Sequence, residues 1–190
     1  MELETQISRL AELGLPLAPG RTVDDLLHSL PRDLFERRPY ELLLSVLGAE
    51  VEREPWGRWF CDRAWNFDTE CVHGPGAYVG IARQLCRTTG RPGAFTDLRD
   101  HVDLSSGEAW IEYTVDGRAR HWSAEVHDDW ADMLLVSYLM EDLERDGRRF
   151  WTRGGGQIVN LYFLDDATAH RVNGLFTDRR PLVPFLGGGG

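Results

Sequence analysis

One stretch of the sequence combines carboxylates with imidazoles and turns back on itself. Asp116 and Gly117 favour a two-residue hairpin turn, because both central residues of such a turn have positive φ. A turn at this point places Glu112 directly opposite His121 on the neighbouring strand. A carboxylate beside an imidazole can act as a general acid and base, and the same pair can also be an exposed salt link of little energetic value. The sequence leaves both interpretations open.

The same register gathers a second set of oxygen and nitrogen ligands. Glu108 is predicted to face Glu125 across the hairpin, with His127 two residues further along the same face. Opposed carboxylates repel, so such a pair is solvated, bridged by an arginine or a cation, or functional. A divalent cation could be held there, but the spacing matches no known metal motif. We therefore assign no catalytic residue, no metal ligand and no cofactor.

Alternation along the hairpin predicts one apolar and one polar face. The apolar face contains Ala109, Ile111, Tyr113, Val115, Trp122, Ala124 and Val126. The polar face contains Glu108, Glu112, Thr114, His121, Ser123, Glu125 and His127. Trp110 is the exception, because the register places this large aromatic side chain among polar neighbours. An aromatic residue ringed by acids is typical of a protein-binding hot spot, whereas cover by a helix would give it a structural role.

Charge is distributed unevenly along the chain. The 190 residues carry a formal net charge of -10, which argues against electrostatic binding of nucleic acid or of anionic membranes. Fourteen acids but only four arginines lie between Asp97 and Asp146, so this stretch accounts for the net charge of the whole chain. Such a stretch is either a solvated surface that keeps the protein soluble or an acidic docking face for a basic partner.

The absence of lysine excludes several classes of enzyme. All 21 basic residues are arginine, so the chain has no lysine for a P-loop, a kinase-type phosphate contact or a Schiff base. The chain has three cysteines, Cys61, Cys71 and Cys86, an odd number without the spacing of a zinc motif. This predicts reduced thiols in a cytoplasmic protein. The sequence has no apolar run long enough to predict a membrane span.

The order of predicted elements favours an α+β fold in one domain. With 42% hydrophobic residues, the chain is long enough to build a single sizeable core. Residues 1–47 are predicted to be a small helical cap, with helices over residues 2–13, 22–30 and 39–47; a strand is the alternative for residues 41–47. In the body, residues 48–176, helices cover a mostly antiparallel mixed sheet whose meander spans residues 100–127.

Gly, Pro and Asp residues, which often begin or end helices and strands, set the expected bounds of the elements in residues 48–176. Strands are expected within residues 59–71, at 102–105, along both arms of the hairpin, and over 150–152 and 158–164. Helices are expected over residues 77–89, over 130–145 after a cap at Asp128 or Asp129, and over 165–173. Residues 177–190 are predicted to be an irregular tail rich in Pro and Gly.

Three segments, Trp65–Glu70, Asp100–Asp103 and Gly107–Trp110, resemble parts of small bacterial proteins, some of which accompany secreted polymorphic toxins as immunity partners. The resemblance implies an α+β protein that neutralises a cognate toxin by covering it. Many such toxins are basic, so an acidic surface would speed their capture. The contact residues implied are Glu108, Trp110, Glu112, Glu125 and Asp128. An enzyme with a carboxylate and histidine site on the 108–128 hairpin, and an adaptor that uses the helical cap, are the alternatives.

Overall fold

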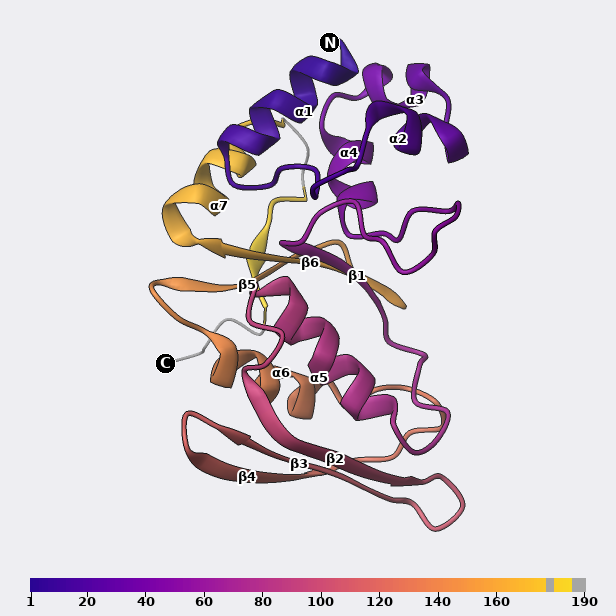
Figure 1. Cartoon of the computed structure of the whole chain (residues 1–190), viewed down its shortest axis with the longest axis vertical. Coiled ribbons are helices and arrows are strands. Elements are labelled where there is room, and N and C mark those ends of the chain that lie inside the picture. Colours follow the sequence, from indigo (N-terminus) through magenta and orange to yellow (C-terminus); the bar gives the residue numbers. More distant parts are fainter. Residues whose placement is uncertain (177–179, 186–190) are drawn as a thin grey trace.

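Helices and antiparallel strands form four layers in the computed structural model, which describes residues 1–176 and 180–185 (Figure 1). The predicted α+β fold class is confirmed. The helices are α1 (Leu3–Glu12), α2 (Val23–Ser29), α3 (Arg32–Arg37), α4 (Glu41–Leu47), α5 (Ala77–Thr88), α6 (Met133–Leu143) and α7 (Asp166–Asn173). The strands are β1 (Ala64–Asp68), β2 (Phe95–Asp103), β3 (Glu108–Val115), β4 (Arg118–Ala124), β5 (Arg148–Arg153), β6 (Ile158–Asp165) and β7 (Val183–Pro184).

The strands divide into two sheets, where the sequence predicts a single mixed one. One sheet has the order β1-β6-β5-β7, the other is the expected meander β2-β3-β4, and all described pairings are antiparallel. Helices α5 and α6 lie between the two sheets, so each sheet turns an apolar face toward them (Figure 1). Alternation in a sequence shows that a strand has an apolar face, but it does not show which sheet the strand joins.

Two apolar clusters lie on opposite faces of the four-stranded sheet. The first, called the inner core, surrounds α5 and α6 and includes Phe67, Leu85, Ile111, Leu139 and Phe163. The second, called the cap core, lies under helices α1–α4 and α7, which cover the other face of that sheet (Figure 1). It includes Leu10, Phe35, Leu44, Tyr162 and Val172.

The helical cap differs from the prediction in its third helix. Thr22 begins α2 as expected, and its hydroxyl accepts a hydrogen bond from Asp25 N while the Asp25 carboxylate accepts one from Thr22 N. Pro31, which was expected only to end that helix, is also the N-cap residue of α3, a helix that the sequence analysis missed. The next helix, α4, begins after Tyr40, whose φ is 71°, so the alternative of a strand over residues 41–47 is wrong.

A buried amide fastens the cap helices to one another. Gln6 on α1 is fully buried, and its Nε2 donates to Phe35 O at 3.0 Å and to Met1 O at 2.9 Å. Its Oε1 accepts a hydrogen bond from Tyr40 N at 2.8 Å. A buried polar side chain is tolerated when its donors and acceptors are satisfied, as they are here.

Helix α6 begins later than the sequence predicts. Its N-cap is Asp132, whose carboxylate accepts hydrogen bonds from the backbone N–H groups of the first turn, and neither Asp128 nor Asp129 caps it. The preceding residues are extended because they pair with the chain that follows β1: Ala131 N donates to Thr69 O at 2.7 Å, and Asp129 O accepts from Val72 N. Because of this pairing, α6 begins at Met133, about one helical turn later than predicted.

The remaining elements follow the prediction, except strand β2 (Phe95–Asp103), which begins before the predicted residues 102–105, and the C-terminal end. Helices α5 and α7 and strands β1, β5 and β6 lie where expected. Within the tail predicted to be irregular, Val183 and Pro184 form the short strand β7 on the edge of β5, and Phe185 N donates to Phe150 O at 2.9 Å. Residues 177–179 and 186–190 lie outside the described part of the tail. Among residues 1–176 and 180–185, no helix has the length and apolar character needed to cross a membrane.

Candidate functional site: the outer face of the three-stranded sheet

The predicted hairpin register is confirmed. Asp116 and Gly117 form the turn with φ of 49° and 74°. The pairs are Ala109 with Ala124, Ile111 with Trp122 and Glu112 with His121. The apolar side chains of β3 are buried in the inner core, as the alternation predicts. The polar side chains must therefore lie on the opposite face of the sheet.

The inner side of the hairpin is anchored to α6 by a polar network. The Tyr113 hydroxyl donates to the Asp142 carboxylate at 2.7 Å and accepts a hydrogen bond from Trp122 Nε1 at 3.1 Å. Arg120 forms two hydrogen bonds with the same carboxylate, and the Trp122 ring stacks on Tyr138 with centroids 4.5 Å apart. Burial raises the pKa of Tyr113, and the hydrogen bond to Asp142 raises it further. The network holds the hairpin as a fixed platform.

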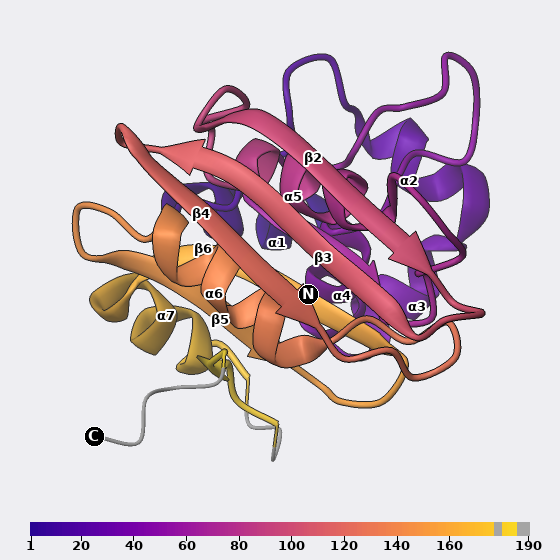
Figure 2. The ribbon, with the colours of Figure 1, turned by 90° about the horizontal axis from the view of Figure 1, so that it is seen from below.

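The outer side of the sheet has no helix over it in the part of the chain that the structure describes. Figure 2 shows the three strands in front, with α5 and α6 behind them. This surface, which we call the outer face, carries Thr96, Arg99, His101, Asp103, Glu108, Trp110, Glu112, Thr114, Ala119, His121 and Ser123. The structural alternative for Trp110, cover by a helix, therefore does not apply.

Trp110 lies at the centre of the outer face between two histidines. His101 is directly opposite it on β2, with ring centroids 5.8 Å apart and an interplanar angle of 21°. His121 is its diagonal neighbour on β4, with centroids 5.7 Å apart and an angle of 31°. Diagonal and direct neighbours on one sheet face interact in this way when they carry aromatic rings. The indole is half-buried by its neighbours and keeps an exposed surface.

His101 and Arg99 are not among the site residues that the sequence predicts. Both lie on β2, which begins at Phe95 and is longer than the short strand predicted at residues 102–105. A β-bulge between Thr96 and Arg99, with Asp97 at a φ of 52°, interrupts the alternation. Alternation counted back from the buried Val102 would have placed both residues on the polar face.

Glu112 is held by two cationic or hydrogen-bonding neighbours. Its carboxylate accepts from Arg99 Nε at 2.6 Å and lies 2.9 Å from His121 Nδ1. The hydrogen bond with His121, together with that from Arg99, lowers the pKa of Glu112. A carboxylate with a lowered pKa is a weaker general base, so this arrangement favours a salt link over acid–base chemistry.

Glu108, Glu125 and Asp128 lie at one end of the outer face and are exposed. The predicted pairing of Glu108 with Glu125 is not formed, because the β3–β4 ladder ends at Ala124. Glu125 instead lies 3.2 Å from the ring nitrogen of its own neighbour, His127. The three predicted ligands Glu108, Glu125 and His127 thus do not form a metal-type group in the described structure.

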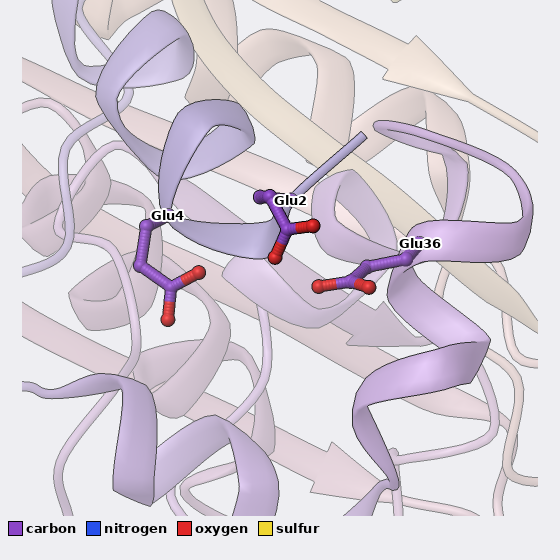
Figure 3. A group of neighbouring side chains, drawn as sticks. All are labelled: Glu2, Glu4 and Glu36. Carbon is purple, nitrogen blue, oxygen red and sulfur yellow. The ribbon is translucent and has the colours of Figure 1, made fainter.

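A group with metal-like spacing occurs elsewhere, at Glu2, Glu4 and Glu36, whose carboxylate oxygens lie within 4.8 Å of one another. Figure 3 shows Glu2 and Glu36 pointing toward each other, with Glu4 further along α1. Arg32 occupies this group, with Nη2 2.8 Å from Glu4 and Nη1 3.3 Å from Glu36. Its hydrogen bond lowers the pKa of Glu4 to about 2. The group is an exposed ion-pair link between α1 and α3.

Several acids of the 97–146 stretch have structural partners. Asp100 accepts hydrogen bonds from Gly76 N and Val79 N at the start of α5, at 2.7 and 3.0 Å. Asp116 is paired with Arg145 at the hairpin tip. These carboxylates stabilise the fold, whereas Glu108, Glu125 and Asp128 are exposed.

The outer face also has a broad depression of about 710 Å³. Arg99, Glu112, Thr114, Ala119 and His121 are among the residues that line it. The depression gives the outer face an uneven surface into which a partner's side chains can fit.

Comparisons of the chain with protein-family models, with curated proteins and with solved structures found no match. The function is therefore argued from the geometry of the outer face alone.

Proposed function

We propose that the protein is a non-catalytic binding protein that covers a basic protein partner with its outer face, as an immunity protein covers a toxin. The observation that carries the proposal is Trp110, a large aromatic residue on an uncovered sheet face, where its ring stacks on His101 and contacts the tilted ring of His121. Tryptophan is enriched among residues that dominate binding energy.

The support for Trp110 is rigid, which favours binding. The inner side of the hairpin is tied to α6 through Tyr113 and Asp142, and His121 is fixed by Glu112. A side chain that is already ordered loses little conformational entropy when a partner covers it. The outer face is thus prepared for contact without rearrangement.

Charge favours a basic partner. Glu108, Glu125 and Asp128 are exposed at one end of the outer face, while Arg99 is neutralised by Glu112. Acids at the rim of an interface attract a positively charged protein and raise its association rate. The residues that the sequence assigns to partner binding therefore have different roles: Trp110 supplies contact area, Glu112 orders its neighbours, and the three exposed acids supply charge.

The test is calorimetric titration of the chain with the product of the neighbouring upstream gene, which this proposal expects to be a basic protein. Trp110→Ala is expected to raise Kd by about 30-fold or more, corresponding to the loss of at least ~2 kcal/mol at a hot spot. Trp56→Ala is the matched control, because Trp56 is 65% exposed on the loop between α4 and β1, away from the outer face. Equal affinities of the two variants would place the docking surface elsewhere.

Charge is tested separately through the association rate at low and high salt. Glu125→Gln is expected to slow association at low salt and to have little effect at high salt. Glu52→Gln, at an exposed position between α4 and β1, is expected to leave the rate unchanged. An association rate that does not change with salt would contradict the proposal that the partner is basic. The role of Trp110 is tested separately by the titration above.

A further inference from the structure

Three arginines from distant parts of the sequence line one small pocket beside the C-terminal end of β6. Arg63 precedes β1, Arg148 begins β5 and Arg171 lies on α7, and the pocket has a volume of about 230 Å³. Pairing with β6 positions two of them: Phe163 N donates to Arg63 O at 3.0 Å, and Arg148 lies opposite Asp165. The antiparallel strands therefore bring these guanidinium groups to one place.

The carboxylates at this pocket are already engaged by other groups. Asp165 is the N-cap of α7, and its two oxygens accept from Thr168 N at 2.8 Å and from Thr168 Oγ1 at 2.9 Å. Glu12 forms an ion pair with an arginine of its own helix at 2.7 Å. Within residues 1–176 and 180–185, neither Arg63 nor Arg148 forms an ion pair with a carboxylate.

The positive charge of Arg148 disfavours the charged form of Arg63. Burial lowers the pKa of Arg63, and repulsion from Arg148 lowers it further. Elsewhere in this acidic chain, Arg53 and Arg120 have carboxylate partners, Asp25 and Asp142. Arg148 attracts the Asp165 carboxylate, but that carboxylate is hydrogen-bonded to Thr168, so a bound anion would give the guanidinium groups a hydrogen-bond acceptor of their own.

We infer that this pocket binds a small molecule carrying a phosphate group, held by Arg63, Arg148 and Arg171. Guanidinium groups match phosphate because each can donate two parallel hydrogen bonds to its oxygens. A phosphate has enough oxygens for three guanidinium groups, whereas a carboxylate has two. At about 30 Å³ per water molecule, the pocket has room for roughly eight waters, so an organic group attached to the phosphate also fits.

This site is independent of the proposed docking function. Its residues belong to the chain before β1, to β5 and to α7, and none of these elements contributes to the β2-β3-β4 sheet. The same phosphate chemistry has two sources, free inorganic phosphate and a phosphate monoester, and their relative affinities distinguish them.

The experiment is an NMR titration of the backbone amides of the full chain. The probes are inorganic phosphate and methyl phosphate, with acetate and chloride at equal ionic strength as controls. Saturable shifts of the Gly14 and Thr168 amides are expected with either phosphate and not with acetate or chloride. Tighter binding of methyl phosphate than of inorganic phosphate indicates a monoester ligand, and the reverse order indicates the free ion.

Variants assign the binding to the arginines. Arg63→Gln and Arg148→Gln are each expected to raise the Kd for phosphate about tenfold or more, as the loss of a charge-assisted hydrogen bond does. Arg83→Gln is the matched control, because Arg83 is exposed on α5 and does not line the pocket. If one variant fails to fold, the other together with Arg171→Gln decides the result. Absence of a saturable shift, equal binding of acetate, or wild-type affinity in both pocket variants overturns the inference.

Discussion

Gly48 lies where the helical cap comes into close contact with the four-stranded sheet. It ends α4 with an ordinary φ of -83°, so its backbone conformation does not require glycine. A Cβ at this position would have Asn66 Oδ1 as its nearest neighbour and would lie 2.7 Å from both Asn66 N and Trp65 C. Two of these three atoms belong to the backbone at β1 and cannot rotate away. Steric contact alone therefore explains the glycine.

Gly48→Ala is expected to destabilise the protein by about 2–4 kcal/mol. Overpacking against a fixed backbone costs about 1–3 kcal/mol. Separation of α4 from β1 also weakens the hydrogen bond from Asn66 N to Gly48 O, 2.8 Å long, and that from Asn66 Nδ2 to Ser45 O, which adds about 1 kcal/mol. Urea unfolding measures the change in the free energy of unfolding, and a fall in Tm of roughly 4–16 °C should accompany it.

Gly80→Ala is the matched control for the same substitution. Gly80 lies within α5, is exposed, and would have nothing within 4 Å of an added Cβ. Alanine in an exposed helix interior is expected to stabilise by about 0.5–1 kcal/mol relative to glycine. The two substitutions thus have opposite predicted signs. A Gly48→Ala variant as stable as the wild type would refute the close approach of α4 to β1.

Two further predictions concern groups whose pKa values differ from the ordinary range. Burial alone raises the pKa of Asp25, but hydrogen bonds from Thr22 and Arg53 outweigh burial and hold it below the usual 3.8. The folded state therefore binds fewer protons there than the unfolded state, so the wild type should lose stability as pH falls below 3.8, and Asp25→Asn should lose less in urea melts at acid pH. Tyr113→Phe should destabilise by about 1–3 kcal/mol in urea at neutral pH, since Trp122 Nε1 loses its buried acceptor. Because burial raises the pKa of Tyr113 above 10, wild-type stability should fall as pH rises through that value, and a variant with an unchanged alkaline profile would contradict this assignment.

The parts of the fold that the sequence predicts correctly are those set by local chemistry. Asp116 and Gly117 determine a turn that fixes every pair along the hairpin, and the Asp165 cap determines the start of α7. The start of α6 could not be chosen in the same way, because several aspartates in succession can each cap a helix. Hydrogen bonds between Thr69 and Ala131, distant in sequence, decide that the later one does so.

The residues of the candidate site likewise include some that local chemistry predicts and some that depend on contacts distant in sequence. The outward position of Trp110 follows from the hairpin register alone. Its neighbour His101 follows from alternation with the buried Val102, but its place opposite Trp110 depends on the register between β2 and β3, which no two-residue turn fixes. The predicted pairing of Glu108 with Glu125 is wrong, because it requires the β3–β4 ladder to continue one residue beyond Ala124, where the ladder ends.

Strand β6 has a consequence for how the molecule comes apart. Val159, Leu161 and Phe163 enter the inner core, while the alternate residues Tyr162 and Leu164 enter the cap core. Unfolding of either the inner core or the cap core would expose apolar side chains of β6, a strand that the other core also contains. The two cores are therefore expected to unfold as one cooperative unit. The amide protons of β6 should accordingly be the last in the chain to exchange with heavy water.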